Sequence, residues 1–510
     1  MRKAVPLILG LLALLAPTAL TGPARAGIPA PEPAATGIAW GPCGPDEQAP
    51  ARVLCGALTV PVDHAAPAGE TLTLALAKRP ATDPARRIGT LMFNPGGPGG
   101  SGVNFIYHAE TGFSADLLAR FDIVSYDPRG QARSRPVLCD STQVDAQSAL
   151  LYPDSPAEYA ALRTANRALA EGCLALTGPL LGHVDTAHVA RDVDAIRAAL
   201  GEEKISLFGV SYGTMISQQY AELFPHRIRA LAMDSSMDHA QGIAGYQGWE
   251  SVAMEESFGQ FAAWCSRTVA CALHGASVLD YFDALYADAD AGDLVVDGAP
   301  VTPEVLVDAV FGYLYGPSLW FELADLLLYI GGDGLAPHGA QLPRGEPVRN
   351  GYLPVMCSDY HYDLYTYPAV AILEKAQNAL ARHTRLNPLA WTDLTGCQNW
   401  PYPVTNPPHR LRASPALPPI LISNSRYDVA TPYQWALGLA GQLPSSRVLT
   451  YDGVGHGTYW LSDCARQTID DYLLAGVLPE AGAHCPAVFP STPLDKQQST
   501  LTSPLPPYGR

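Results

Sequence analysis

A serine between two glycines stands out as the residue best placed to act as a nucleophile. Gly209-Val210-Ser211-Tyr212-Gly213 spells G-x-S-x-G, preceded by a strand-like run at 204–208 and followed by a helix-forming run at 214–224. Strand, sharp turn and helix are the context of a nucleophile elbow, which exposes the serine hydroxyl. A bare G-x-S-x-G also recurs by chance in loops, so the flanking pattern is what predicts a catalytic Ser211.

An acid and a histidine follow Ser211 in the order that a Ser-Asp-His triad requires. Asp428 comes just after a buried strand predicted at 419–424, and His456 lies in a glycine-flanked loop after a strand predicted at 447–451. Alone, Asp428 is an ordinary turn residue and His456 an ordinary loop residue. Together with Ser211, each at the carboxyl end of a predicted strand, they predict a triad in which His456 is the base and Asp428 orients it.

A glycine-rich loop predicts the oxyanion hole. Residues 94–102 follow an apolar strand and contain five glycines. In an elbow enzyme such a loop supplies one backbone N–H, and the residue after the nucleophile, here Tyr212, supplies the other. The prolines of the loop have no N–H, so Gly97 is the best donor, with Gly96 and Gly99 as alternatives. A phosphate-binding loop is the competing interpretation, but no Gly-Lys-Ser/Thr ending follows.

These residues need an alternating arrangement of strands and helices to bring them together. Strands are predicted at 54–62, 71–78, 89–94, 121–126, 204–209 and 228–233, with a helix at 189–200. This alternation predicts an α/β fold with a mostly parallel sheet covered on both faces. The pattern stops near Asp238 and resumes near Leu417; the intervening residues have helical periodicity and are interpreted as a helical cap.

The motifs resemble those of the secreted alpha/beta-hydrolases of the tripeptidyl and prolyl aminopeptidase group, peptidase family S33. The resemblance covers about residues 38–485 and is carried by 94–102, 126–130, 209–214, 397–401, Asp428 and Gly455-His456. It implies an alpha/beta-hydrolase fold with a large inserted helical cap. It also implies a serine exopeptidase that needs no cofactor or metal and acts on peptides with a free N-terminus.

The resemblance further implies acids in the cap that bind the substrate's ammonium group. Glu255 and Glu256 lie early in the predicted cap, where relatives place such acids. The competing interpretation is that both are solvent-exposed helix residues. Four cap aromatic residues are candidates for an apolar pocket, although ordinary core packing is the favoured interpretation for each: Tyr313, Tyr315, Trp320 and Tyr360.

The chain divides into five predicted segments. These are a signal peptide at 1–26, a first core segment at 38–238, a cap at 239–416, a second core segment at 417–485 and a Pro-rich tail at 486–510. Residues 1–26 have a basic start, an apolar run and a terminal Ala24-Arg25-Ala26, typical of a cleaved signal peptide. The expected location is therefore extracellular, with no stable membrane association after the signal is removed.

The ten cysteines favour disulfides, because an even count is typical of an exported chain. Spacing alone does not determine the connectivity. Nearest-neighbour pairing, which the implied fold would place locally, gives Cys43–Cys55, Cys139–Cys173, Cys265–Cys271, Cys357–Cys397 and Cys464–Cys485. A cysteine metal site is the alternative, and the lack of any C-x-x-C pair disfavours it.

The net charge of −17 argues against nucleic acid and anionic membranes as partners. It is compatible with a substrate that carries an ammonium group, although a solvated acidic surface explains it equally well. Three rival functions remain, of which an epoxide hydrolase or dehalogenase is disfavoured because those enzymes have an acid where Ser211 stands. A secreted esterase or lipase would share the whole triad, and a non-catalytic binding protein on this fold would be expected to lack a member of it.

Overall fold

A ten-stranded sheet forms the centre of the computed structural model, which describes residues 37–332 and 347–492. The strands, in spatial order, are β1 (Gly41–Pro42), β2 (Leu54–Pro61), β3 (Thr71–Arg79), β5 (Phe121–Tyr126), β4 (Gly89–Asn94), β7 (Ile205–Ser211), β8 (Ile228–Ser236), β12 (Ile420–Tyr427), β13 (Ser446–Val454) and β14 (His484–Cys485). The pairs from β1 to β5 are antiparallel, and those from β5 to β14 are parallel.

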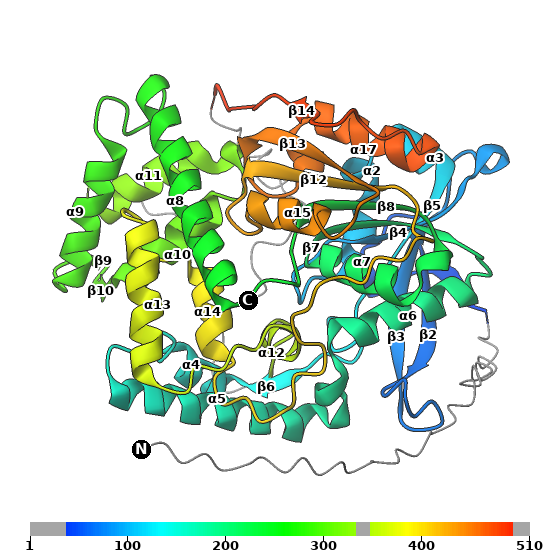
Figure 1. Ribbon diagram of the computed structural model, residues 1–510, viewed down its shortest axis with the longest axis horizontal. Helices are drawn as coiled ribbons and strands as arrows, with labels where there is room; N and C mark the ends of the chain where they lie inside the picture. Colours follow the sequence, from blue (N-terminus) through cyan, green and yellow to red (C-terminus); the bar gives the residue numbers. More distant parts are fainter. Residues whose placement is uncertain (1–36, 333–346, 493–510) are drawn as a thin grey trace, which may run out of the picture. The chain divides into compact units, whose positions relative to one another are not determined.

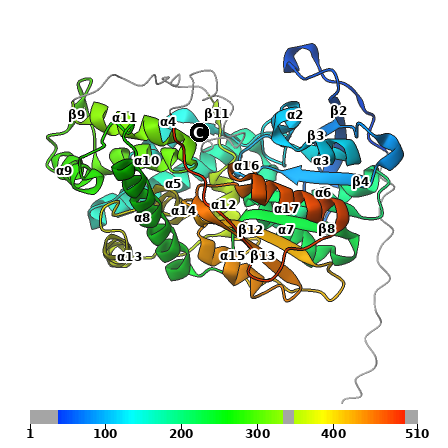
Figure 2. The ribbon, with the colours of Figure 1, turned by 90° about the horizontal axis from the view of Figure 1, so that it is seen from above.

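Helices cover both faces of this sheet (Figures 1 and 2). The helices on one face are α6 (Thr186–Ala199), α7 (Tyr212–Leu223) and α15 (Tyr433–Ala440). Those on the other face are α1 (Gly102–Tyr107), α3 (Ala115–Arg120) and α17 (Asp463–Ala475). Every residue of the central strand β4 is buried, as expected for a parallel strand covered on both sides. The predicted fold class is therefore confirmed.

A second group of helices lies beside the sheet and comes mainly from the predicted cap (Figures 1 and 2). Its members are α8 (Ile243–Arg267), α9 (Val278–Asp290), α10 (Pro303–Tyr313), α11 (Trp320–Ile330), α12 (Leu353–Asp359), α13 (Tyr367–Leu380) and α14 (Pro388–Gly396). An aromatic core that includes Phe258, Phe282 and Trp320 joins several of these helices. The same core includes Val429 and Ala430, so it continues to the loop after β12.

One segment that precedes the predicted cap packs against it. Strand β6 (Leu138–Asp140) pairs with β11 (Pro347–Arg349), and α4 (Ser141–Ser148) and α5 (Pro156–Thr177) follow β6. Asn166 on α5 donates to the backbone carbonyls of Thr395 and Gln398. The sequence interpretation assigned this segment to the hydrolase core and did not anticipate α5. The predicted boundaries at 238 and 417 stay predictions.

Five disulfides join the same pairs that the sequence analysis preferred: Cys43–Cys55, Cys139–Cys173, Cys265–Cys271, Cys357–Cys397 and Cys464–Cys485. Two of them hold elements far apart in sequence, since Cys139–Cys173 ties β6 to α5 and Cys357–Cys397 ties α12 to the end of α14.

The predicted signal peptide and most of the predicted tail lie outside the described residues. Within residues 37–332 and 347–492, no helix combines the length and the apolar character needed to cross a bilayer. The start of the tail is described and packs onto the protein. There the Trp264 indole N–H donates to the Pro490 carbonyl at 3.0 Å, and the Tyr451 hydroxyl accepts from the Val488 N–H.

Candidate active site

Ser211 occupies a strained turn between β7 and α7. Its φ of 58° and ψ of −130° are unusual for a residue with a side chain. The flanking glycines make the turn possible. A Cβ on Gly209 would lie 2.3 Å from the Gly213 carbonyl oxygen, and one on Gly213 would lie 2.4 Å from the Asn94 carbonyl oxygen. The local geometry is that of a nucleophile elbow.

Asp428 and His456 form a buried pair. Their side chains are 0% and 2% exposed, and the His456 Nδ1 lies 2.9 Å from Asp428 Oδ1 and 3.0 Å from Oδ2. The carboxylate also accepts from the backbone N–H groups of Ala430 and Thr431 and from the Thr431 hydroxyl. Because a carboxylate accepts, Nδ1 carries a proton, which leaves Nε2 available as a base.

The loop that carries His456 is fixed from two sides. The His456 N–H donates to the Tyr315 carbonyl at 2.8 Å, and the two rings meet edge to face. On the other side, Asp234 at the end of β8 accepts from the N–H groups of Thr458 and Tyr459. Burial raises the pKa of Asp234 to about 6, against the effect of these hydrogen bonds. The sequence analysis missed this acid, whose only signal is its position at a strand end.

The loop after β4 lies directly against the elbow. A Cβ on Gly96 would be 2.7 Å from the Ser211 Cβ, and Gly96 adopts a φ of +94° that favours glycine. The Gly96 N–H already donates to Asn94 Oδ1, and the Gly99 N–H donates to Gln131 Oε1. Gly97 lines the same pocket as Ser211. Of the three glycines, Gly97 therefore remains the best candidate to pair with the Tyr212 N–H.

A pocket brings these elements together between the sheet and the cap helices. It is lined by Pro95, Gly97, Pro98, Ser211, Met237, Tyr246, Tyr315, Tyr352, Met356, Leu389, Ala430, Thr431 and His456. Ser211 and His456 face this one space. Most of the remaining wall is aromatic or apolar. Of the four aromatic residues suggested by the sequence, Tyr315 lines the pocket, whereas Trp320 is fully buried in the cap core.

Neither acid suggested as the ammonium site lines this pocket. Glu255 accepts from the N–H groups of His383 and Thr384 and from the Thr384 hydroxyl, so its carboxylate holds a loop of the cap. Glu256 is solvent-exposed. The rotation of α8 explains this placement, because it turns Glu250 and Met254, one helical turn apart, toward the interior.

Glu250 and Asp393 are the acids buried behind the pocket wall. The hydroxyl of Tyr246, a pocket residue, donates to Asp393 Oδ2 at 2.6 Å, and Tyr352 also hydrogen-bonds this carboxyl. Glu250 Oε2 accepts from Asn387 at 2.9 Å, while its Oε1 has no hydrogen-bond partner among the described residues. The sequence analysis did not single out either residue, because charged residues are normally exposed.

Both carboxyls resist ionisation. Burial raises the pKa of Glu250 well above its usual range, and the nearby charges of Asp393 and Asp428 raise it further. Burial likewise raises the pKa of Asp393 to about 7 against the opposing hydrogen bonds from Tyr246 and Tyr352. The groups acting on Glu250 are thus acids and one amide, with no cation among them. A site of this kind favours a positively charged ligand.

Comparisons with known proteins agree with the fold. A family model described as alpha/beta hydrolase fold matches residues 89–285, and one described as TAP-like protein matches residues 386–485. The chain is 34% identical over 478 residues to the tripeptidyl aminopeptidase of Streptomyces lividans, covering 88% of this chain and 87% of that one. It is 32% identical over 485 residues to serine protease Hip1 of Mycobacterium tuberculosis, covering 88% and 91%.

A third relative has a different name. Carboxylesterase B of Mycobacterium tuberculosis is 31% identical over 467 residues, covering 84% of this chain and 86% of its own length. The fold places this protein in the class of alpha/beta hydrolases. The extent of these matches shows that the chain belongs to the tripeptidyl aminopeptidase-like family within that class, and that it is a serine peptidase.

Proposed function

We propose that this protein is an exported aminopeptidase that cleaves peptides with a free N-terminus through a Ser211–His456–Asp428 triad. The observation that carries the substrate assignment is the pair of buried acids, Glu250 and Asp393, directly behind the pocket. The elbow geometry of Ser211 and the buried Asp428–His456 pair support the chemistry.

In the proposed reaction, Ser211 Oγ attacks the scissile carbonyl while His456 Nε2 takes its proton. His456 then protonates the leaving amine, and water hydrolyses the acyl-enzyme by the same route. Asp428 fixes the imidazole tautomer and stabilises the imidazolium. The N–H groups of Tyr212 and Gly97 stabilise the oxyanion, each contributing roughly 3–4 kcal/mol.

The substrate's ammonium group is proposed to bind beside Glu250 and Asp393. In the free enzyme the two carboxyls hold protons more readily than usual, because ionising both would place uncompensated charges in the interior. An incoming ammonium lowers their pKa and pairs with the ionised form. The enzyme would then discriminate strongly against blocked substrates, since acetylation leaves the acids without a cation.

Comparison of free and N-acetylated peptidyl amides tests this proposal. The wild-type enzyme is expected to cleave the free forms at least about a hundredfold faster, since losing one partner of a buried ion pair costs about 3–5 kcal/mol. Glu250→Gln should reduce that ratio. The matched control Glu256→Gln, an exposed acid on the same helix, should leave it unchanged. Equal rates on free and blocked peptides would refute the aminopeptidase proposal.

A carboxylesterase is the second candidate, because one relative of similar identity carries that name. The apolar pocket wall suits an acyl group as well as an amino-acid side chain. Short acyl esters in the same assay separate the two functions. A carboxylesterase would hydrolyse uncharged esters efficiently and would be insensitive to Glu250→Gln, whereas the proposed aminopeptidase would depend on the substrate's ammonium.

Export is proposed because the signal-like N-terminus occurs together with five disulfides, and such bonds persist mainly in oxidising compartments. Fractionation of the native host and N-terminal sequencing of the extracellular form test it. The expected mature protein begins after Ala26. Recovery of the full-length chain from the cytoplasm alone would contradict the assignment.

A further inference from the structure

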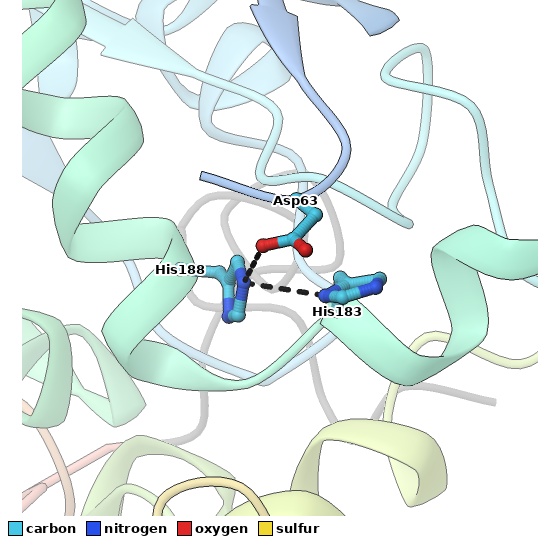
Figure 3. A group of neighbouring side chains, drawn as sticks. All are labelled: Asp63, His183 and His188. Carbon is cyan, nitrogen blue, oxygen red and sulfur yellow. Dashed lines mark hydrogen bonds and ion pairs between the residues drawn. The ribbon is translucent and has the colours of Figure 1, made fainter. Parts of the chain in front are cut away.

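Two histidines and an aspartate converge at a surface site that does not contribute to the pocket. Asp63 lies in the turn after β2, His183 ends a short helical segment (Pro179–His183), and His188 lies in the first turn of α6. Figure 3 shows the three side chains directed toward one another. His183 Nδ1 lies 3.3 Å from His188 Nε2, and Asp63 Oδ1 lies 4.0 Å from the same His188 nitrogen.

The tautomer of His188 is set by Asp185. His188 Nδ1 lies 2.6 Å from Asp185 Oδ2, so Nδ1 carries the proton and donates to the carboxylate. In neutral His188 the lone pair of Nε2 therefore points toward His183 and Asp63. A carboxylate behind a histidine in this way is the usual support of a metal-binding imidazole.

The spacing fits one tetrahedral ion. Metal–ligand bonds of about 2.0–2.1 Å place tetrahedral ligands about 3.3 Å apart, which is the separation between the two histidine nitrogens. All three candidate ligand atoms lie within 4.8 Å of one another. The Asp63 side chain is 36% exposed, so its carboxylate has room to rotate the remaining distance.

Neighbouring charged groups are already paired and leave the cluster free to bind a cation. His64 Nε2 contacts Asp192 at 2.9 Å, so it is not oriented as a fourth ligand. Arg129, a nearby cation, is fully buried and forms an ion pair with the same Asp192 at 2.7 Å.

We propose that Asp63, His183 and His188 form a binding site for one divalent transition-metal ion of the zinc class, with a solvent molecule completing the coordination. Two imidazoles and one carboxylate are a ligand set that zinc accepts. The ion would tie the turn after β2 to the start of α6. The proposal is independent of the proposed aminopeptidase function, because none of the three residues lines the pocket.

The site is connected to the elbow through the start of α6. Asp185 caps this helix, and the next residue, Thr186, shares a hydrogen bond of 2.8 Å with the hydroxyl of Tyr212. A bound ion would therefore hold the segment that contacts the residue after the nucleophile. We expect the ion to raise the thermal unfolding temperature, since a ligand that binds only the folded state stabilises it.

Metal titration of the chelator-treated protein, produced without a histidine tag, tests the site. Zn²⁺ competition with a chromogenic chelator should give one site per chain, and Co²⁺ should give the absorption of a tetrahedral complex. His188→Gln should weaken Zn²⁺ binding by well over tenfold, and Asp185→Asn, which keeps a helix-capping side chain, by about ten- to a hundredfold.

His484→Gln is the matched control, because His484 contacts Asp452 at 3.0 Å but belongs to no three-ligand cluster among the described residues. It should bind Zn²⁺ as the wild type does and show the same metal-induced rise in Tm. No saturable binding by the wild type, or equal affinity of wild type and His188→Gln, would overturn the proposal. Melting curves of the metal-free variants show whether each is folded.

Discussion

The hydrogen-bond partners of each buried acid at this site determine what that acid can do. Asp428 is completely buried, yet two backbone N–H groups, the Thr431 hydroxyl and His456 all donate to it. These donors satisfy the carboxylate oxygens in the absence of solvent. Glu250 and Asp393 are buried to a similar degree but receive fewer donors. Buried carboxylic acids therefore have two different roles in the proposed site. Asp428 supports the histidine base, whereas Glu250 and Asp393 are proposed to bind a cation.

Replacing Ser211 by alanine tests the nucleophile. We expect peptidase activity to fall by at least about a thousandfold, because loss of a triad nucleophile removes the covalent route. Ser217→Ala is the control, since this buried serine on α7 donates to the Gly213 carbonyl and does not line the pocket. It should retain activity within about tenfold of wild type. Steady-state kinetics with circular dichroism would separate lost chemistry from lost folding, and an active, folded Ser211→Ala protein would exclude the proposed mechanism.

The raised pKa of Asp393 predicts a pH-dependent stability. Its folded-state pKa of about 7 exceeds its ordinary value of 3.8, so the folded state favours the protonated form. The stability that this group contributes is full below pH about 4 and is lost as pH rises through about 7. Asp393→Asn cannot ionise at this position. Its free energy of unfolding should therefore exceed that of the wild type by roughly 1–4 kcal/mol at pH 8, and by less at pH 4.

Denaturant unfolding of both proteins at pH 4 and pH 8 measures this difference. The variant should also bind free-amine peptides less tightly, with a raised KM at pH 8. If the stability difference between variant and wild type is the same at both pH values, Asp393 does not titrate as described.

At the scale of elements, the loop after β4 and the elbow after β7 form one unit. Strands β4 and β7 are hydrogen-bonded neighbours in the sheet, so the loops at their carboxyl ends meet. Gly96 allows this contact because its backbone approaches Val210 and Ser211 more closely than a side chain would permit. Strand pairing, rather than either loop alone, thus positions the proposed oxyanion donors.

Gly96→Ala should damage both stability and activity. The added Cβ would lie 2.5 Å from the Val210 carbonyl oxygen, at a φ of +94° that alanine rarely adopts. We expect a loss of at least about 1–3 kcal/mol in the free energy of unfolding. A displaced elbow should also lower kcat/KM by about a hundredfold.

Gly259→Ala provides the comparison, because a Cβ at this helical position meets nothing within 4 Å. It should leave activity unchanged and add up to about 1 kcal/mol of stability. Chemical denaturation and steady-state kinetics measure both variants. If Gly96→Ala behaves like Gly259→Ala, the loop does not pack against the elbow as described.

At the scale of the whole molecule, one disulfide closes the segment at 138–177 on itself, and two others join parts of the cap. In the chain-entropy model, a disulfide stabilises more when it closes a longer loop. Cys357–Cys397 spans 40 residues, whereas Cys265–Cys271 spans only 6. Replacing the first pair by serines should lower the free energy of unfolding by about 4 kcal/mol, and replacing the second by about 2 kcal/mol.

Mass spectrometry after alkylation checks the framework on which this comparison depends. The native protein should take up no alkylating agent, and the reduced, unfolded protein should take up ten equivalents, one per cysteine. Two or more reactive thiols in the native state would contradict five disulfides. Equal destabilisation by the two serine double variants would instead contradict the loop-length argument.

Local patterns were enough to predict the sheet and the disulfide pairs, and they also gave the residues of the proposed triad. The strand predicted at 204–209 corresponds to β7, and the one predicted at 89–94 to β4. Such predictions succeed because a strand, a tight glycine turn and a helix depend on neighbouring residues. The order of Ser211, Asp428 and His456 adds the constraint that the carboxyl ends of parallel strands share one edge.

Tertiary structure alone decided which acids are buried behind the pocket wall. Glu250 and Glu255 lie on one helix, and charged residues of this kind are normally exposed, because burying a charge is unfavourable without a partner. Only the packing of α8 against α14 places Glu250 near Asp393. The cluster of Asp63, His183 and His188 likewise exists only after the turn following β2 meets α6. Such contacts join residues that are far apart in sequence, so no local sequence pattern predicts them.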